Sequence, residues 1–298
     1  MATLKELKTR IGSVSSSEKI TGAMKMISSA KVRKTEQELR RLLPFKNQIK
    51  SILGHLLSAG ENYSSPLTVE REVKKIGLVV YGSDDGLCGA YNINIFKYLL
   101  VRLRAFRAKY GNDVEVTLLP VGRKMEKAVR RYADDHPEIS VRTVKGVNSK
   151  MSGEKVNEFT LDLKKEFTDG SLDDIEVVYM QFKSIGKQIA TCERLFPVDK
   201  DGINAKAGDV SGKDTLYIFE PDANSIFNEV LPMFVLSMMQ EITIENRASE
   251  QAARIMAMQA ANDNAKKLQD SLQLEYNKLR QQGITTELLD ILGGQVQK

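Results

Sequence analysis

Apolar residues recur at three- and four-residue spacing over both ends of the chain, residues 3–58 and 222–290. This spacing puts them on one face of an α-helix, and few Gly or Pro residues interrupt it. Each end is therefore predicted to be one continuous helix, and the second would be roughly 100 Å long at about 1.5 Å per residue. No globular domain of this size needs so long a helix, so we expect the chain to work within a larger assembly.

The two end helices are predicted to pair as a long antiparallel coiled coil. In the first helix the heptad-like apolar positions are expected to slip in phase once. They are Leu4, Leu7, Ile11 and Val14, followed by Ile20, Met24 and Ile27. The second helix offers small residues and then larger ones, namely Ala248, Ala252, Ala253, Ala257, Ala260 and Ala261, then Leu268, Leu272, Tyr276 and Leu279. The small residues allow the two backbones to approach closely. Pro232 is expected to kink or restart the second helix.

Between the end helices, short β-branched runs alternate with helical segments. Strands are predicted at 74–81, 114–121, 139–144, 175–182, 187–198 and 215–220, helices at 90–109, 123–133 and 154–167, and a mobile loop at 199–213. This alternation is typical of an α/β domain of Rossmann-like type, with a largely parallel sheet and one antiparallel edge. The predicted domains are a first shaft helix (1–60), the central α/β domain (72–220) and a second shaft helix (222–298).

The composition leaves little material for a metal site or a general base. The 298 residues include no Trp and two His, His55 and His136, while Cys88 and Cys192 are far apart and form no CxxC motif. The chain opens without an apolar signal segment, which favours a cytosolic compartment with reduced thiols. The best apolar stretch, residues 230–239, is too short to span a bilayer. We expect no metal and no cofactor.

Positive charge is concentrated in the first helix. Residues 1–34 contain eight Lys or Arg residues against Glu6 and Glu18, which gives a formal charge of about +6, whereas the whole chain carries +5. Such a helix can bind acidic protein loops, an anionic membrane or nucleic acid, or it can be a solvated face. A coiled-coil adaptor for nucleic acid is therefore the alternative function, although the first 44 residues lack the aromatic side chains that stack on bases.

The turn after the first predicted strand, residues 82–89, occupies the position of a phosphate-binding loop. It has neither the GxGxxG spacing nor the Gly-Lys-Ser/Thr ending, and Asp84 and Asp85 would repel a phosphate. Cys88 has no nearby His in the sequence and is expected to pack the start of the next helix. Asp134 and Asp135 are interpreted as a loop that ends a helix. No catalytic site is predicted.

Three stretches of the sequence resemble the gamma subunit of F-type ATP synthase. They are KITGAMKMISSAKVRK at 19–34, SDDGLCGAYNINIF at 83–96, and the segment 245–294, which contains ENRASEQAARIMAMQAANDNA and LQLEYNKLRQQGITTELLDILGG. The motifs stand in family order and cover both ends and the middle of the chain. One departure is Asp85, where the family commonly has a basic residue.

The resemblance implies that the coiled coil is a rotor shaft inside a ring of three alpha and three beta subunits. The α/β domain would then lie against the epsilon subunit and the membrane c-ring. Such a subunit is not an enzyme by itself: it carries torque that couples proton flow to ATP synthesis or hydrolysis. The implied location is peripheral, on the cytoplasmic face of the bacterial inner membrane, with the membrane reached only through partners and no nucleic acid bound.

The resemblance also assigns contact residues, each with the alternative that it is an ordinary surface or seam residue. Met24, Lys25 and Arg254 would lie near an acidic loop of beta, while Arg280, Gln281, Thr285 and Glu287 would hydrogen-bond a second loop of beta. An apolar bearing at the top of the ring would receive Leu288, Leu289, Ile291 and Leu292. Tyr217 and Glu220 would belong to the foot that meets epsilon and the c-ring.

Overall fold

The computed structural model describes residues 3–58, 63–111, 113–199 and 219–295. Internal contacts divide the chain into two compact units, Met1–Ser29 with Arg254–Lys298, and Ala30–Ala253. We call them the helical unit and the α/β unit. Helices α1 (Leu4–Ser58) and α6 (Ala223–Gln295) contribute to both units. The division into domains 1–60, 72–220 and 222–298 stays a prediction.

Local hydrogen bonds set the starts of both long helices. The Thr3 N–H donates to Glu6 Oε2 (2.8 Å) and the Glu6 N–H donates to Thr3 Oγ1 (3.2 Å), which is a capping box. At the start of α6, Asp222 Oδ1 accepts the Ser225 N–H at 2.8 Å. Both helices then run without a break, as the apolar spacing predicted.

Of the two outcomes expected at Pro232, a kink or a restart of the second helix, the restart is wrong and the kink stays a prediction. Residue 232 lies inside α6, which is continuous from Ala223 to Gln295. A proline within a helix removes one hydrogen bond and costs about 3 kcal/mol. Its neighbours Leu231 and Val235 are only 0% and 2% exposed in the core of the α/β unit, and burial of this face offsets the cost.

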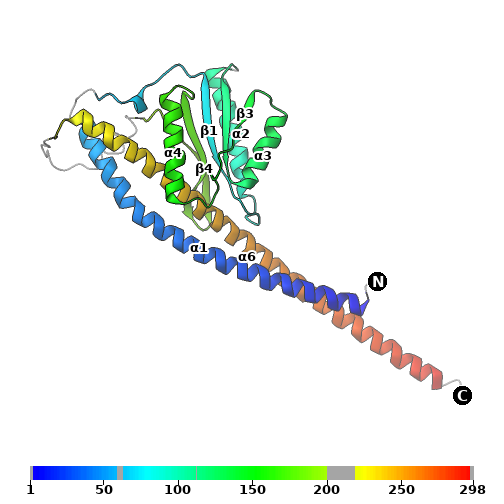
Figure 1. The fold of residues 1–298 in the computed structure, drawn as a ribbon. Coiled ribbons are helices and arrows are strands. Elements are labelled where there is room, and N and C mark those ends of the chain that lie inside the picture. The colour runs from blue at the N-terminus through cyan, green and yellow to red at the C-terminus, as the bar shows by residue number, and fades with distance from the viewer. Residues whose placement is uncertain (1–2, 59–62, 112, 200–218, 296–298) are drawn as a thin grey trace. The chain divides into compact units, whose positions relative to one another are not determined.

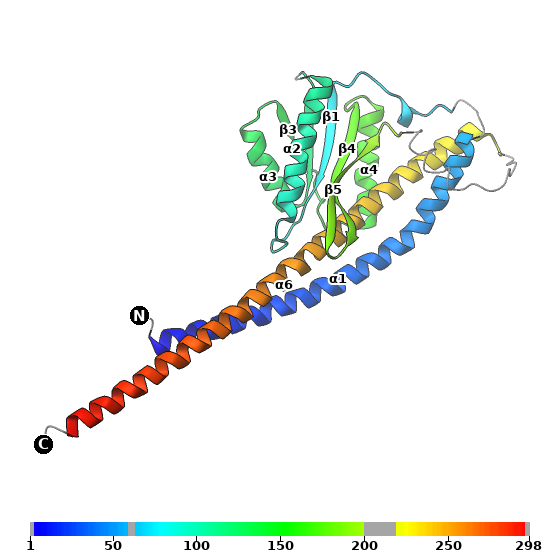
Figure 2. The ribbon, with the colours of Figure 1, turned by 180° about the vertical axis from the view of Figure 1, so that it is seen from behind.

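In the helical unit, residues 4–29 of α1 run antiparallel to residues 254–295 of α6 and lie beside the first part of them, and the C-terminal part of α6 extends beyond the N-terminal end of α1 (Figures 1 and 2). The Lys25 ammonium donates to Gln259 Oε1, and the Asn262 amide donates to the Glu18 carbonyl at 2.8 Å. A Cβ placed on Gly22 would lie 3.5 Å from Asn262 Nδ2. A side chain of α6 therefore reaches the backbone of α1, and the close approach of the two backbones through small residues stays a prediction.

The expected phase slip in α1 is wrong, because one unbroken heptad frame runs along the helix through positions that are all buried or partly buried, whereas the apolar Ile20 and Ile27 lie outside it. In the helical unit these are Leu7, Ile11, Val14, Glu18, Thr21, Lys25 and Ser28. In the α/β unit the frame continues with Val32, Thr35, Leu39, Leu42, Lys46, Ile49, Leu53 and Leu56. Ile20 and Ile27, assigned to the seam by their hydrophobicity, are 59% and 56% exposed. On α6, Leu272 is buried as expected, but Leu268 is 51% exposed.

The α/β unit contains a five-stranded sheet in the order β3-β2-β1-β4-β5 within the described residues. The strands are β1 (Lys75–Tyr81), β2 (Glu115–Val121), β3 (Ile139–Val141), β4 (Asp174–Ser184) and β5 (Lys187–Phe196). Every neighbouring pair is parallel except β4 and β5, which form an antiparallel hairpin. The prediction of a largely parallel sheet with one antiparallel edge is confirmed.

Helices cover both faces of this sheet (Figure 2). On one face, α2 (Tyr91–Tyr110) and α3 (Arg123–Asp134) bury residues such as Ile95, Leu99 and Val129. On the other face, α4 (Gly153–Thr168) packs with the parts of α1 and α6 that belong to this unit. The 3₁₀-helix η1 (Pro66–Thr68) leads into the domain, with Leu67 buried.

Two predicted strands differ from the structure. The strand expected at 139–144 is limited to Ile139–Val141, which pairs only with β2 at the edge of the sheet. Of the strand expected at 215–220, residues 215–218 lie outside the described residues, and Phe219 and Glu220 are not in a strand. The predicted loop 199–213 also lies outside the described residues from position 200 onward.

Candidate functional site

Two glycines bring the ends of β1 and β2 together. A Cβ on Gly82 would lie 2.5 Å from the Cβ of Met125, so only glycine fits there. Gly122 has φ +102°, and a Cβ on it would lie 3.0 Å from the Gly82 backbone. A side chain at either position is therefore excluded by contact or by backbone strain. The turn 82–89 consequently lies directly against the start of α3.

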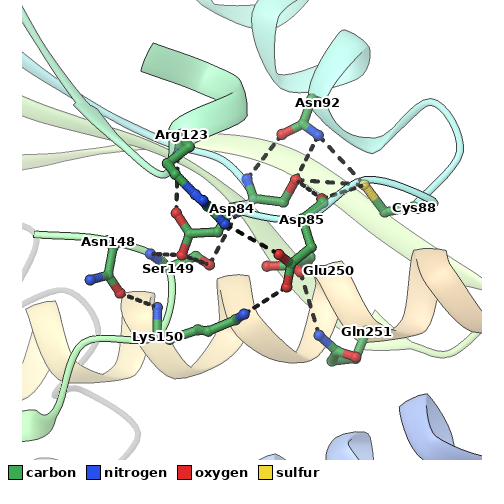
Figure 3. Close-up of polar contacts among 11 residues, drawn as sticks. Asp84, Asp85, Cys88, Asn92, Arg123, Asn148, Ser149, Lys150, Glu250 and Gln251 are labelled. Atoms are coloured by element: carbon green, nitrogen blue, oxygen red, sulfur yellow. Dashed lines mark hydrogen bonds and ion pairs between the residues drawn. The ribbon is translucent and has the colours of Figure 1, made fainter. Parts of the chain in front are cut away.

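Asp84 joins this turn to two other segments of the α/β unit (Figure 3). Its side chain is buried; Oδ1 accepts the Arg123 N–H at 3.0 Å, and Oδ2 accepts the N–H and the hydroxyl of Ser149 at 3.1 and 2.8 Å. Both carboxylate oxygens are thus taken by protein donors. The carboxylate stabilises a junction, and sequence reasoning, which treated it only as a repellent of phosphate, missed this role.

Asp85, the departure from the family pattern, lies in two ion pairs. Its carboxylate is 2.6 Å from the Lys150 ammonium and 3.5 Å from the Arg123 guanidinium. All three side chains are largely exposed, so each pair contributes at most about 1 kcal/mol. The pairs neutralise Asp85 and connect the turn with the loop before α4.

Cys88 has the packing role that its sequence context predicted. The side chain is 3% exposed, and its Sγ lies 3.7 Å from Ser83 Oγ and 3.5 Å from Asn92 Nδ2. In the segments that the structure describes, no group of three or more His, Cys, Asp or Glu residues could hold a metal ion. The arrangement can fix the turn to α2.

The predicted shaft contacts lie in the helical unit and differ in exposure. Met24 and Lys25 are partly buried, and Lys25 is engaged by Gln259. Arg254 is 6% exposed, so other atoms of this chain cover most of it. Around Met24 the basic side chains of Lys19 and Lys31 are exposed. The first helix therefore presents positive charge to its surroundings.

The predicted contacts near the end of α6 are all exposed. Four polar residues of this group are Arg280, Gln281, Thr285 and Glu287. Four apolar ones follow, Leu288, Leu289, Ile291 and Leu292, with exposures of 55%, 62%, 62% and 59%. Large exposed apolar side chains gathered on one short segment are typical of a surface that a partner covers.

Of the two residues predicted for the foot, Tyr217 and Glu220, only Glu220 is among the described residues. Glu220 is exposed and lies just before the start of α6. Tyr217 lies outside the described residues. Of the predicted contacts, Met24 and Lys25 are thus partly buried neighbours on α1, and those near the end of α6 are exposed. The assignment of Tyr217 and Glu220 to one foot stays a prediction.

These observations define a protein with paired terminal helices and an α/β unit inserted between them in the sequence. The sequence model of the ATP synthase family matches residues 3–296. The chain is 38% identical to the ATP synthase gamma chain of Bacteroides thetaiotaomicron over 304 residues, covering 100% of both chains. It is 37% identical to the ATP synthase gamma chain of Stenotrophomonas maltophilia strain R551-3 over 295 residues, covering 99% of both.

Solved structures support the same fold. A rotor chain of the Euglena gracilis mitochondrial ATP synthase matches with a TM-score of 0.60 at 19% identity, covering 94% of this chain and 98% of that one. A central-stalk chain of the Tetrahymena thermophila mitochondrial ATP synthase matches with a TM-score of 0.54 at 20% identity, covering 81% and 99%. This chain belongs to the ATP synthase gamma-chain family.

Proposed function

We propose that this chain is the central rotor shaft of an F-type ATP synthase and carries torque between the membrane c-ring and the catalytic beta subunits. The observation that carries the proposal is the antiparallel pair of terminal helices in the helical unit, followed on α6 by an exposed apolar end. Membership of the gamma-chain family gives this pair its context. In this role the shaft couples proton transport to ATP synthesis or hydrolysis.

A pair of helices has no threefold symmetry, and this asymmetry is what a rotor needs. In a ring of three alpha and three beta subunits, each beta subunit would meet a different face of the shaft. A shaft angle that favours one beta conformation over another changes nucleotide affinity there, and nucleotide binding acts back on the angle. Torque and chemistry are then linked by one coupling free energy.

Beta subunits would contact the shaft at two levels. Near the first level, Met24 and Lys25 lie on a helix with exposed positive charge, which suits an acidic loop. At the second, Arg280, Gln281, Thr285 and Glu287 offer exposed donors and acceptors for a loop of beta. The exposed Leu288, Leu289, Ile291 and Leu292 would form an apolar bearing. Because Arg254 is covered in the chain, we assign it to supporting α6 beside these contacts.

Bond chemistry belongs to the partner subunits in this proposal. The turn 82–89 has the place of a phosphate loop, but both carboxylate oxygens of Asp84 are engaged, and Asp85 is paired with the basic side chains of Lys150 and Arg123, which are then less available to a phosphate. Neither feature favours a bound phosphate. The chain is thus a non-catalytic subunit of an enzyme complex.

The foot would meet epsilon and the c-ring through Tyr217 and the exposed Glu220. Over the residues described, no helix is long and apolar enough to cross a bilayer. We propose that the chain reaches the membrane through the c-ring and epsilon, on its cytoplasmic face.

An affinity-tagged chain, purified from gently solubilised native membranes, tests the proposal. Alpha, beta, epsilon and c subunits should co-purify in a complex that hydrolyses ATP, and the hydrolysis should drive proton uptake after reconstitution into vesicles. The alternative, a nucleic-acid adaptor, predicts instead that DNA or RNA co-purifies and is lost steeply as salt rises. Absence of alpha and beta from the purified complex would contradict the rotor function.

A further inference from the structure

Asn246 of helix α6 contacts the sheet of the α/β unit at the level just beyond the end of strand β1. Strand β1 pairs with β4 only as far as Val80 opposite Val178, whereas β4 continues to Ser184. Beyond that point the Met180 N–H donates to the side-chain oxygen of Asn246, on α6, at 3.2 Å. The Asn246 side chain therefore accepts the hydrogen bond of a β4 amide just beyond the end of β1, where β1 no longer pairs with β4.

The same oxygen holds a second element. Tyr91, the first residue of α2, donates its hydroxyl proton to Asn246 Oδ1 at 2.7 Å and lies 3.2 Å from the Asn246 carbonyl oxygen. An amide oxygen has two lone pairs, and both are used here. Asn246 is 1% exposed and Tyr91 3%, so water cannot replace either bond. One turn earlier on α6, the Thr243 hydroxyl lies 2.7 Å from that of Tyr81, the last residue of β1.

Apolar packing and directional hydrogen bonds resist different motions. Packing around α6 opposes separation of the helix from the sheet and large rotations that would expose its apolar face, but it is non-directional and tolerates small rotations better than hydrogen bonds do. Hydrogen bonds weaken steeply once the angle or distance changes. In a water-free interior an amide that loses its partners is costly, so the bonds of Asn246 oppose small rotations of α6 against the sheet.

We propose that Asn246 is the positioning residue that fixes the rotational register of α6 on the α/β domain, so that torque applied to the domain turns the helix. Thr243 supports it through Tyr81. This inference rests on the proposed rotor function and goes beyond it by naming where force enters the helix. Asn246 touches no substrate and acts through α2 and β4.

The test compares complexes that contain Asn246→Leu, Asn246→Asp and Tyr91→Phe. Leucine has a similar size but no acceptor, whereas aspartate keeps an acceptor oxygen at the same place. Phenylalanine removes one donor and leaves Asn246 intact. The matched control is Ser249→Ala on the same helix, because Ser249 is 0% exposed and its hydroxyl has no hydrogen-bond partner among the described residues.

Two quantities are measured for complexes of equal subunit content. The first is coupling, the number of protons pumped into vesicles per ATP hydrolysed. The second is the angular stiffness of the rotor, taken from the fluctuations of a probe attached to the α/β unit. A role limited to folding would lower the yield of complex but not these two quantities per complex. We expect Asn246→Leu to lose stiffness and coupling, Tyr91→Phe to lose part of both, Asn246→Asp to lose less than Asn246→Leu because it keeps the acceptor but buries a charge, and Ser249→Ala to match the parent. Hydrogen exchange at the Met180 amide should accelerate in the leucine variant alone.

Parental stiffness and coupling in Asn246→Leu would overturn the proposal, as would an equal loss in Asn246→Asp. If the leucine variant does not assemble, Tyr91→Phe decides: reduced coupling supports the proposal and parental coupling overturns it. Failure of the rotor function itself is seen separately, because the parent complex would then not pump protons or would lack this chain.

Discussion

At the scale of single residues, Met24 and Lys25 have different surroundings although they are neighbours. Lys25 occupies a heptad position and its ammonium is bound by Gln259 of α6. Met24 is partly buried beside this position, with the exposed Lys19 and Lys31 on the same helix. The positive charge exposed near Met24 therefore comes from Lys19 and Lys31 more than from Lys25.

Replacing Met24 with Lys should impair coupling while the fold and assembly stay intact. A new ammonium that meets an acidic loop of beta forms a charge-assisted hydrogen bond of about 1.5 to 3 kcal/mol at some rotor angles only. That bond deepens one resting state and raises the barrier to leaving it. ATP hydrolysis and proton pumping in membranes should show lower coupling and a steeper temperature dependence.

Met24→Leu is the matched control, because it exchanges one apolar side chain for another of similar size. This variant should behave almost as the parent. Equal behaviour of the Lys and Leu variants would mean that position 24 does not touch the surrounding subunits.

Glu245, on α6, should make stability depend on pH near neutrality. Burial, together with the carboxylates of Glu241 and Glu193, raises the pKa of Glu245 from 4.5 to about 7, against the opposing effect of Lys183 and Lys46. The folded state then binds the proton more tightly than the unfolded state. The protonated Glu245 therefore contributes its full share to the free energy of unfolding below about pH 4.5, and this contribution is lost as the pH rises through 7.

Glu245→Gln removes the charge and should therefore stabilise the chain at pH 8 but hardly at pH 4.5. Because part of the side chain is solvated, we expect a gain of about 1 to 2 kcal/mol in the free energy of unfolding at pH 8. Urea unfolding across this pH range measures it. The exposed Glu229 on the same helix provides the control, and a pH-independent difference between Glu245→Gln and the parent would contradict the prediction.

At the scale of elements, the sequence was sufficient for most helices and strands because each has a clear period, although the strand expected at 139–144 is limited to Ile139–Val141. The seam of α1 was harder to predict. Its heptad positions in the middle hold Glu18, Thr21, Lys25 and Ser28, while apolar Ile20 and Ile27 lie outside the seam. Hydrophobicity alone therefore pointed to the wrong face. Polar residues at such positions are known to fix the register of paired helices, and a fixed register suits a shaft.

The unbroken heptad frame predicts opposite outcomes for two similar substitutions. Leu7 is 1% exposed, so Leu7→Ala should destabilise the pairing of α1 and α6 in the helical unit by about 2 to 5 kcal/mol. Ile20 is 59% exposed, and Ile20→Ala should change it by less than about 0.5 kcal/mol. Hydrogen-exchange protection over residues 4–29 measures both. If Leu7→Ala and Ile20→Ala lowered the protection by similar amounts, Ile20 would belong to the seam and the predicted phase slip would be correct.

The candidate site could be predicted only in part. The tail residues could be assigned from the sequence because the segment 245–294 resembles the gamma-subunit family, and their exposure is consistent with the contacts expected there. The bonds of Asp84 with Ser149, and of Asn246 with Tyr91 and Met180, join residues far apart in the chain. No local period or spacing encodes such pairs, since they depend on how the sheet brings its loops and α6 together.

At the scale of the whole molecule, the purified chain should neither hydrolyse ATP nor bind it tightly. Tight binding of a nucleotide requires backbone amides, a lysine and a metal-binding carboxylate arranged around the phosphates. In the turn 82–89, the Asp84 carboxylate is already bound by Arg123 and Ser149. Titration with Mg-ATP in a calorimeter should give no saturable heat. Submicromolar binding would overturn this view of the turn.

Shortening the end of α6 should weaken the rotor gradually. Leu288, Leu289, Ile291 and Leu292 are exposed and apolar, and apolar contacts with a bearing add up roughly with the area that they bury. They have no required direction, so no single residue is indispensable. Stepwise removal from Lys298 toward Thr285 should therefore lower assembly yield and torque in steps, with rotation still visible in the complexes that assemble. The torque of single complexes, measured at equal subunit content, checks this. If removing only the last few residues stopped rotation in fully assembled complexes, the end of α6 would have to make a specific, directional contact instead.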